Sequence, residues 1–257
     1  MTSPDKDFGP IRTDYAFFEE HSTEAEEDLA GYRRILDALG RTGGSGPLRV
    51  LDFGCGPGGF TARALGMIAW PGAVDLSIVE PQALYREQAA RELPRITGRP
   101  VEAFERRPPE GRCYDLVLSN HVLYYVNDLE QAAGWLVDAV APGGLLMTSL
   151  AGANNLLIQF WIQAFGLLGQ PVPYHTSEQL AEAFAGRGIE PQRHEVEYRL
   201  EFLDTAENRA SILRFLLGDH FERLPREQLL AFFDPHAVDG RIDTRIQHDH
   251  YAWVRPS

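Results

Sequence analysis

An acidic residue precedes a cluster of glycines in the segment Asp52-Phe53-Gly54-Cys55-Gly56-Pro57-Gly58-Gly59. Glycines let the backbone turn tightly and let a nucleotide-like ligand approach without a Cβ in the way. The carboxylate of Asp52 would repel a pyrophosphate and attract a positively charged group. The pattern therefore predicts a loop that binds a cationic nucleoside, the sulfonium compound S-adenosylmethionine. Its expected contacts are Asp52, Gly54, Cys55, Gly56, Gly58 and Phe60.

Polar side chains also stand at the ends of two later apolar runs. Glu80 ends the second predicted strand and is suited to accept hydrogen bonds from both hydroxyls of a ribose. The carboxyl ends of parallel strands meet at one edge of a sheet, and open α/β sheets bind ligands in that crevice. We expect four further cofactor contacts there, namely Glu80, Pro81, Ser119 and Asn120.

His121 directly follows the fourth predicted strand. A protonated amine or a hydroxyl group must lose a proton before it attacks a methyl group, and imidazole titrates near neutrality. His121 is therefore predicted to be a catalytic base. The alternative is a turn histidine without a chemical role.

Other histidines do not form a recognisable metal motif. His248 and His250 alternate on a predicted strand, so their imidazoles would face one side. No third ligand stands at a familiar spacing, and we expect no metal. One of these side chains is expected to reach the substrate pocket from the closing strand.

Short apolar runs alternate with helical patterns between residues 48 and 150, as in a parallel sheet covered on both faces. The predicted strands are Leu48–Phe53, Val74–Glu80, Val101–Phe104, Tyr114–Asn120 and Leu145–Leu150. The helices between them are Phe60–Ile68, Pro81–Leu93 and Asp128–Val140, the last ended by Pro142-Gly143-Gly144.

Further elements precede and follow this core. We expect helices at Asp14–Leu39 (one or two), Leu156–Leu168, Ser177–Arg187, Thr205–Leu217 and Arg226–Phe233, and strands at Gln192–Phe202 and Arg245–Val254. The Gly-rich linker Gly40–Pro47 divides the chain into an N-terminal helical cap at residues 1–46 and a domain at residues 47–257. That domain would carry helical substrate-binding insertions at about 153–190 and 204–240.

Composition places the 257-residue chain among ordinary globular proteins, with 44% hydrophobic and 24% charged residues. A net charge of −13 disfavours nucleic acid as a partner, because polyanion binding draws on clustered Lys and Arg. Cys55 and Cys113 fit neither a disulfide framework nor a metal spacing. Residues 1–8 lack a signal-peptide core and no apolar run approaches 18 residues, so we expect a cytoplasmic protein without membrane contact. The sequence indicates no oligomeric state.

Three motifs occur together in Val50–Leu150: the acidic glycine loop, the acid at Glu80 and the Pro142–Gly144 turn before the fifth strand. With these motifs the segment resembles the class I S-adenosylmethionine-dependent methyltransferases. The resemblance implies a Rossmann-like α/β fold, in which a seven-stranded sheet with its last strand antiparallel has helices on both faces. Helical additions at the two ends would form a substrate lid.

Several segments outside this core resemble the histamine N-methyltransferase family. They are Phe18–Glu24, Val79–Pro81, Val122–Val126, Tyr174–Ser177 and the helix around Phe215. The resemblance implies that Glu24 binds a substrate amine and that Tyr15, Tyr124 and Tyr125 wall the pocket. The chain departs from the family at His121, where the family has an amide, and at Gln247 or His248, near its C-terminal asparagine.

We therefore expect methyl transfer to a small molecule, at a nitrogen of an amine or imidazole-like compound. The substrate-binding residues would be Tyr15, Glu24, His121, Tyr124, Tyr125, Phe160, Trp161, Phe215, Gln247 and His248. The aromatic residues on the apolar helix at 156–168 have core packing as their alternative role. Other hypotheses are an O- or C-methyltransferase of secondary metabolism, a cofactor-binding module without turnover, and a NAD-dependent dehydrogenase, which the carboxylate of Asp52 disfavours.

Overall fold

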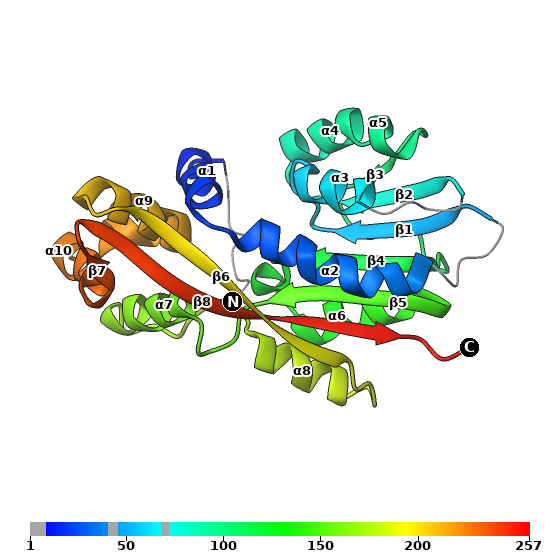
Figure 1. Cartoon of the computed structure of the whole chain (residues 1–257). Helices are drawn as coiled ribbons and strands as arrows, with labels where there is room; N and C mark the ends of the chain where they lie inside the picture. Colours follow the sequence, from blue (N-terminus) through cyan, green and yellow to red (C-terminus); the bar gives the residue numbers. More distant parts are fainter. Residues whose placement is uncertain (1–8, 41–45, 68–71) are drawn as a thin grey trace.

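A twisted β-sheet runs through the molecule in the computed structural model, which describes residues 9–40, 46–67 and 72–257 (Figure 1). The strands are β1 (Leu48–Phe53), β2 (Val74–Val79), β3 (Glu102–Phe104), β4 (Tyr114–Asn120), β5 (Val140–Leu150), β6 (Gln192–Leu203), β7 (Ala237–Val238) and β8 (Arg241–Val254). Their order is β3-β2-β1-β4-β5-β8-β6, with β7 paired to β8. Strands β1 to β5 are parallel, and β8 is antiparallel to both β5 and β6. The predicted seven-stranded α/β sheet is confirmed, with β7 as an additional short strand.

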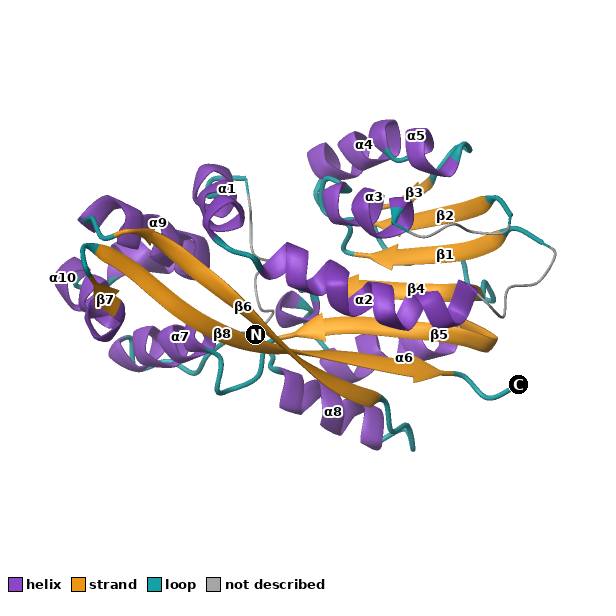
Figure 2. Cartoon of the chain, viewed as in Figure 1, coloured by secondary structure: helices purple, strands orange, loops and turns teal. Residues whose placement is uncertain are grey.

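Helices cover both faces of this sheet (Figure 2). They are α1 (Arg12–His21), α2 (Glu24–Gly40), α3 (Gly59–Gly66), α4 (Ala83–Glu92), α5 (Pro94–Thr97), α6 (Leu129–Ala139), α7 (Leu156–Leu167), α8 (Ser177–Ala185), α9 (Ala206–Leu217) and α10 (Arg226–Leu230). Short 3₁₀ turns lie at Leu123–Tyr125, Gly218–Arg223 and Ala231–His236. None of the helices in the described ranges is long and apolar enough to cross a bilayer.

Two clusters of buried side chains hold these layers together. Alternate residues of a strand point to opposite faces, so Val50 belongs to a cluster with side chains of α2, α3 and α4, while Leu51 belongs to a cluster with side chains of α6 to α9. The parallel strands therefore have apolar side chains on both faces, as in a covered parallel sheet. The site at the carboxyl ends of these strands has a rigid base.

The boundaries differ from the sequence predictions where pairing decides them. Strand β8 begins four residues before the predicted start because all of β6 pairs with it, from Gln192 opposite Ala252 to Leu203 opposite Arg241. Strand β5 includes the predicted Pro142–Gly144 turn as an irregularity in its register with β4. The predicted features at residues 1–8, most of the linker Gly40–Pro47, and Ile68 lie outside the described residues.

The segment predicted as one or two N-terminal helices is two helices joined at Ser22 and Thr23. Ser22 is extended and bridges to Leu200 of β6, and Thr23 exchanges two hydrogen bonds with Arg199 of the same strand. The hydroxyl of Ser22 also accepts from the backbone N–H of Glu24 at 3.1 Å, which starts α2. Pairing with β6 therefore fixes where Glu24 enters the fold.

Candidate functional site

A cavity of about 950 Å³ lies at the carboxyl ends of the parallel strands, beneath α1 and α2. Ligand pockets in proteins usually measure about 300–1,000 Å³, so this cavity has room for two small molecules side by side. Its wall can be described as two halves. The cofactor half follows β1 and β2, and the acceptor half is formed by α1, α2 and the segments after β4 and β5.

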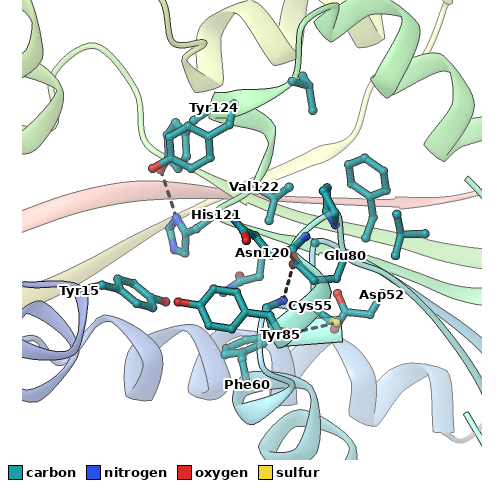
Figure 3. Close-up of a pocket in the computed structure, with 18 of the residues that line it drawn as sticks. Tyr15, Asp52, Cys55, Phe60, Glu80, Tyr85, Asn120, His121, Val122 and Tyr124 are labelled. Carbon is teal, nitrogen blue, oxygen red and sulfur yellow. Dashed lines mark hydrogen bonds between the residues drawn. The ribbon is translucent and has the colours of Figure 1, made fainter. Parts of the chain in front are cut away.

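Glu80 is the central carboxylate of the cofactor half. Its Oε2 accepts the backbone N–H of Gly56 at 3.0 Å and its Oε1 accepts that of Gln82 at 2.9 Å (Figure 3). The side chain is buried, and burial raises its pKa. A carboxylate has about four acceptor positions, so both oxygens keep lone pairs for a ligand in the cavity. This arrangement suits the predicted contact with a ribose.

Asp52 is buried at the end of β1, where the Thr61 hydroxyl donates a hydrogen bond to it. Burial raises the pKa of Asp52 to about 7, although the Thr61 hydrogen bond opposes this, and the negative charge of Glu80 adds to the increase. Two carboxylates thus face one hollow and repel each other. A cationic ligand between them would relieve that repulsion, so these residues fit S-adenosylmethionine.

The other predicted cofactor contacts fall into two groups. Gly54, Cys55, Gly56, Phe60, Pro81 and Asn120 line the cavity. Gly58 and Ser119 are not part of the wall among the described residues, because Gly58 packs under the loop near Ala89 and Ser119 is buried within the sheet. Tyr85, which the sequence analysis did not single out, also lines this half.

The side-chain amide of Asn120 is fixed at the boundary between the halves. Its oxygen accepts from the Tyr32 hydroxyl at 2.9 Å and its nitrogen donates to Asp28 Oδ2 at 3.1 Å. Both partners belong to α2. The cofactor edge of the sheet is therefore tied to the helix that carries Glu24.

His121 has a left-handed backbone conformation, with φ of 54°. Its Nε2 lies 3.0 Å from Asp28 Oδ2 and 3.1 Å from the Ser149 hydroxyl, and its Nδ1 lies 3.1 Å from the Tyr124 hydroxyl. Burial alone would lower its pKa, but the carboxylates of Glu24 and Asp28 raise the pKa to about 9. A group with that pKa holds its proton at neutral pH, which favours a binding role over proton abstraction. The catalytic role of His121 stays a prediction.

Asp28 is a site residue that the sequence analysis missed. The buried carboxylate accepts from Asn120 and His121 through Oδ2, and from Nε2 of His248 at 2.6 Å and of His250 at 2.7 Å through Oδ1. The two histidines on β8 do share one side of the strand, as predicted. Asp28 follows Glu24 by one helical turn, and that spacing, which places both acids on one face of α2, is the available sequence pattern.

Aromatic side chains form most of the remaining acceptor half. Tyr15, Tyr124, Tyr125, Trp161 and Phe215 line the cavity as predicted, and Tyr198 of β6 adds to them. Their rings pack on one another: the centroids of Tyr124 and Trp161 lie 5.6 Å apart, and those of Tyr15 and Phe215 lie 5.4 Å apart. Mutual packing of this kind holds the wall in shape before a ligand binds.

Three predicted substrate contacts are corrected by the structure. Phe160 packs edge-on against Phe233 in the core and is not part of the cavity wall. Gln247 is exposed on β8, and its backbone carbonyl accepts from Asn155. His248 lies behind the wall, where it contacts Asp28. These three residues are absent from the cavity wall in the described part of the chain.

The His and carboxylate cluster has the residue types of a metal centre. Potential ligand atoms of Asp28, His248 and His250 lie within 4.8 Å of one another, as do those of Glu24, His121 and His248. A metal-bound imidazole normally donates its other N–H to an acceptor. The Nδ1 atoms of His248 and His250 have no hydrogen-bond partner among the described residues. A metal on Nε2 would leave two buried N–H groups unpaired, and we interpret the cluster as a hydrogen-bond network.

Cofactor affinity is expected to depend on pH through Asp52. A cationic ligand prefers the ionised carboxylate, so binding strengthens as pH rises through about 7 and weakens by up to tenfold per unit below that value. Calorimetric titration with S-adenosylmethionine between pH 5.5 and 7.5 measures this dependence. The variant Asp52→Asn should flatten it, and an equal dependence in that variant would show that another group is responsible.

Comparisons with known proteins agree with this geometry. The profile of a methyltransferase domain family matches residues 24–194. A malonyl-[acyl-carrier protein] O-methyltransferase of Pseudescherichia vulneris is 33% identical over 60% of this chain and 61% of its own length. Histamine N-methyltransferase A of Xenopus laevis is 25% identical over 60% of this chain and 59% of its own length. The chain thus matches less than two thirds of either relative.

A solved structure of a putative methyltransferase from Bacillus halodurans shares the fold. It superposes with a TM-score of 0.58 over 90% of this chain and 99% of its own, at 13% sequence identity. At that identity the likeness concerns the fold alone.

Proposed function

The chain belongs to the class I S-adenosylmethionine-dependent methyltransferases, and from this premise we propose that it methylates a nitrogen of a small amine or imidazole-like compound. The bound cofactor supplies an electrophilic methyl group on a sulfonium. The cofactor half, with Asp52 and Glu80, would hold it, and the acceptor half would hold the second molecule.

The main support for this proposal is the negative charge of the acceptor half. Glu19 and Glu24 line it and Asp28 lies beneath them, against the imidazolium of His121. The Glu24 oxygen lies 3.8 Å from His121 Nε2, beyond hydrogen-bond distance, so the carboxylate keeps lone pairs for a ligand. Aromatic faces around it tolerate a cation and exclude water. Such a pocket favours an ammonium or a protonated ring.

Catalysis would then come mainly from position. Displacement at a methyl group needs the acceptor nitrogen in line behind it, and holding two reactants together removes much of the entropic barrier. Glu24 is placed to bind the ammonium, and Tyr198, which hydrogen-bonds to it, fixes its direction. An ammonium has no lone pair, so the attacking nitrogen would be a second, neutral nitrogen of the substrate, or the amine itself after its proton has passed to the Glu24 carboxylate. The rings of Tyr125 and Trp161 would restrict the substrate to one orientation.

The likeness to histamine N-methyltransferase A, which extends over 177 residues, supports a nitrogen acceptor. The alternative is methylation of an oxygen, which the likeness to an O-methyltransferase and the cation of His121 favour, because an imidazolium also suits a carboxylate substrate. Cofactor binding without turnover is a third possibility. Incubation with labelled S-adenosylmethionine and a panel of amines, phenols and carboxylic acids separates the three.

The variant Glu24→Gln is expected to lower kcat/KM for cationic amines about tenfold, since a hydrogen bond to a charged group contributes about 1.5 kcal/mol or more. Steady-state kinetics with amines and with neutral acceptors measures the effect. Glu27→Gln is the matched control, because Glu27 is an exposed acid in the same turn of α2. Transfer to oxygen or carbon alone, or equal losses in both variants, would contradict the proposed function.

A further inference from the structure

Resting on the proposed function, we infer that Asp28 and His121 together make the Tyr124 hydroxyl a hydrogen-bond donor to the substrate. The preferred acceptor molecule would then carry, besides the methylated nitrogen, a second group with a free lone pair, such as a ring nitrogen or a carbonyl. The inference follows from hydrogen-bond partners at each atom of the cluster.

The cluster contains three imidazoles around one carboxylate, and only one of them has partners at both nitrogens. His248 and His250 each bond to Asp28 through Nε2, and their Nδ1 atoms have no partner in the described part of the chain. Each of these two rings therefore reaches Asp28 through Nε2 and has no partner at its other nitrogen among the described residues. His121 has Asp28 at Nε2 and the Tyr124 oxygen at Nδ1, so it has an acceptor for each N–H of an imidazolium.

The surroundings of His121 favour the same state. Asp28 and Glu24 of α2 both face Nε2, at 3.0 and 3.8 Å, and the centroid of the His248 ring lies 4.7 Å from that of His121 on the side of β8. Ser149 of β5 contributes a hydroxyl. The pKa of His121, raised to about 9 by the two carboxylates, agrees with a positive charge at neutral pH.

Tyr124 is where this charge affects the cavity. Its oxygen already accepts the backbone N–H of Ala151 at 2.6 Å. When His121 Nδ1–H donates as well, both lone pairs of the oxygen are engaged, and the hydroxyl hydrogen needs an acceptor of its own. Tyr124 lines the cavity, with its hydroxyl toward His121 at the acceptor end (Figure 3). A lone pair of the substrate is the acceptor that this geometry calls for, because an unpaired buried hydroxyl is costly.

Deprotonation of His121 reverses the direction of its hydrogen bond with the Tyr124 hydroxyl. A neutral His121 that still donates through Nε2 to Asp28 must accept at Nδ1, so the Tyr124 hydroxyl turns toward it and stops donating to the substrate. The preference for lone-pair substrates is therefore present below about pH 9 and is lost as pH rises through that value.

An NMR titration of the His121 ring in the full chain tests the first step, with His121→Gln to assign its signal. We expect a midpoint near pH 9 in the wild type and a midpoint at least one unit lower in Asp28→Asn. A wild-type midpoint near 6.5, the ordinary value of a free histidine, would overturn the inference without any variant having to fold.

A pair of amines of similar size tests the second step. The probes are 2-(4-imidazolyl)ethylamine, which has a ring lone pair, and 2-phenylethylamine, which has none. We expect Tyr124→Phe to raise KM for the first about tenfold more than KM for the second, with thermal unfolding as the check on folding. Equal changes for both probes would overturn the inference. Transfer to neither probe, while acids or phenols are methylated, would instead contradict the proposed function, and the NMR titration still decides the state of His121.

Discussion

Replacing Glu80 by alanine is expected to weaken binding of S-adenosylmethionine about 100-fold. The carboxylate is held by the backbone N–H groups of Gly56 and Gln82, and its free lone pairs face the cavity. Loss of two charge-assisted hydrogen bonds of about 1.5 kcal/mol each removes about 3 kcal/mol of binding free energy. Isothermal calorimetry with the cofactor measures the change directly.

Two further variants separate ligand contact from loop support. Glu80→Gln keeps the size of the side chain and one carbonyl oxygen, so we expect a smaller loss than in Glu80→Ala. Glu87→Gln removes the same charge from an exposed position on α4 and should leave the dissociation constant within about twofold. Unchanged affinity in Glu80→Ala would show that the ribose does not bind at the end of β2.

The strands that carry the site were predictable because local sequence decides them. Leu48–Phe53 and Tyr114–Asn120 are apolar runs in which both faces are buried, and the structure confirms both boundaries. The proximity of the glycine loop after β1 and the acid after β2 was predictable as well, because parallel strands present their carboxyl ends at one edge of the sheet. The extent of β8 was not predictable in this way, because its first four residues are held as strand by long-range pairing with β6 and by the short strand β7.

The acceptor half depends more on how elements pack than on their local pattern. Asp28 meets His248 across 220 residues of sequence, and no spacing rule connects a helix to a strand so distant. His121 reaches Asp28 from a left-handed backbone conformation that its residue type does not dictate. On α7, Trp161 lines the cavity and Phe160 does not, because successive helical residues differ by about 100° in direction. A periodic apolar pattern shows which face of a helix is buried. It does not show which residues at the edge of that face line a cavity.

The second large effect is expected at Gly54, where alanine should destabilise the fold by about 2–5 kcal/mol. Its φ is +80°, a conformation that costs a residue with a side chain about 1–2 kcal/mol. An added Cβ would also lie 2.2, 2.5 and 2.8 Å from Cγ2, Cγ1 and Cβ of Val122, and overpacking of that kind costs about 1–3 kcal/mol. Urea unfolding of the variant measures the sum.

A double-mutant cycle with Val122→Ala separates the two contributions. The second substitution removes the atoms nearest to the new Cβ, so it should restore the overpacking part of the loss and leave the backbone part. Gly59→Ala is the control, because Gly59 begins α3 with no described atom within 4 Å of an added Cβ. The methyl group that Gly54→Ala introduces would push on Val122. Because Val122 follows His121 directly, this would displace the segment that positions the imidazole. We therefore expect Gly54→Ala to weaken cofactor binding and also to lower the pKa of His121, whereas an unchanged His121 titration would mean that the loops after β1 and β4 move independently.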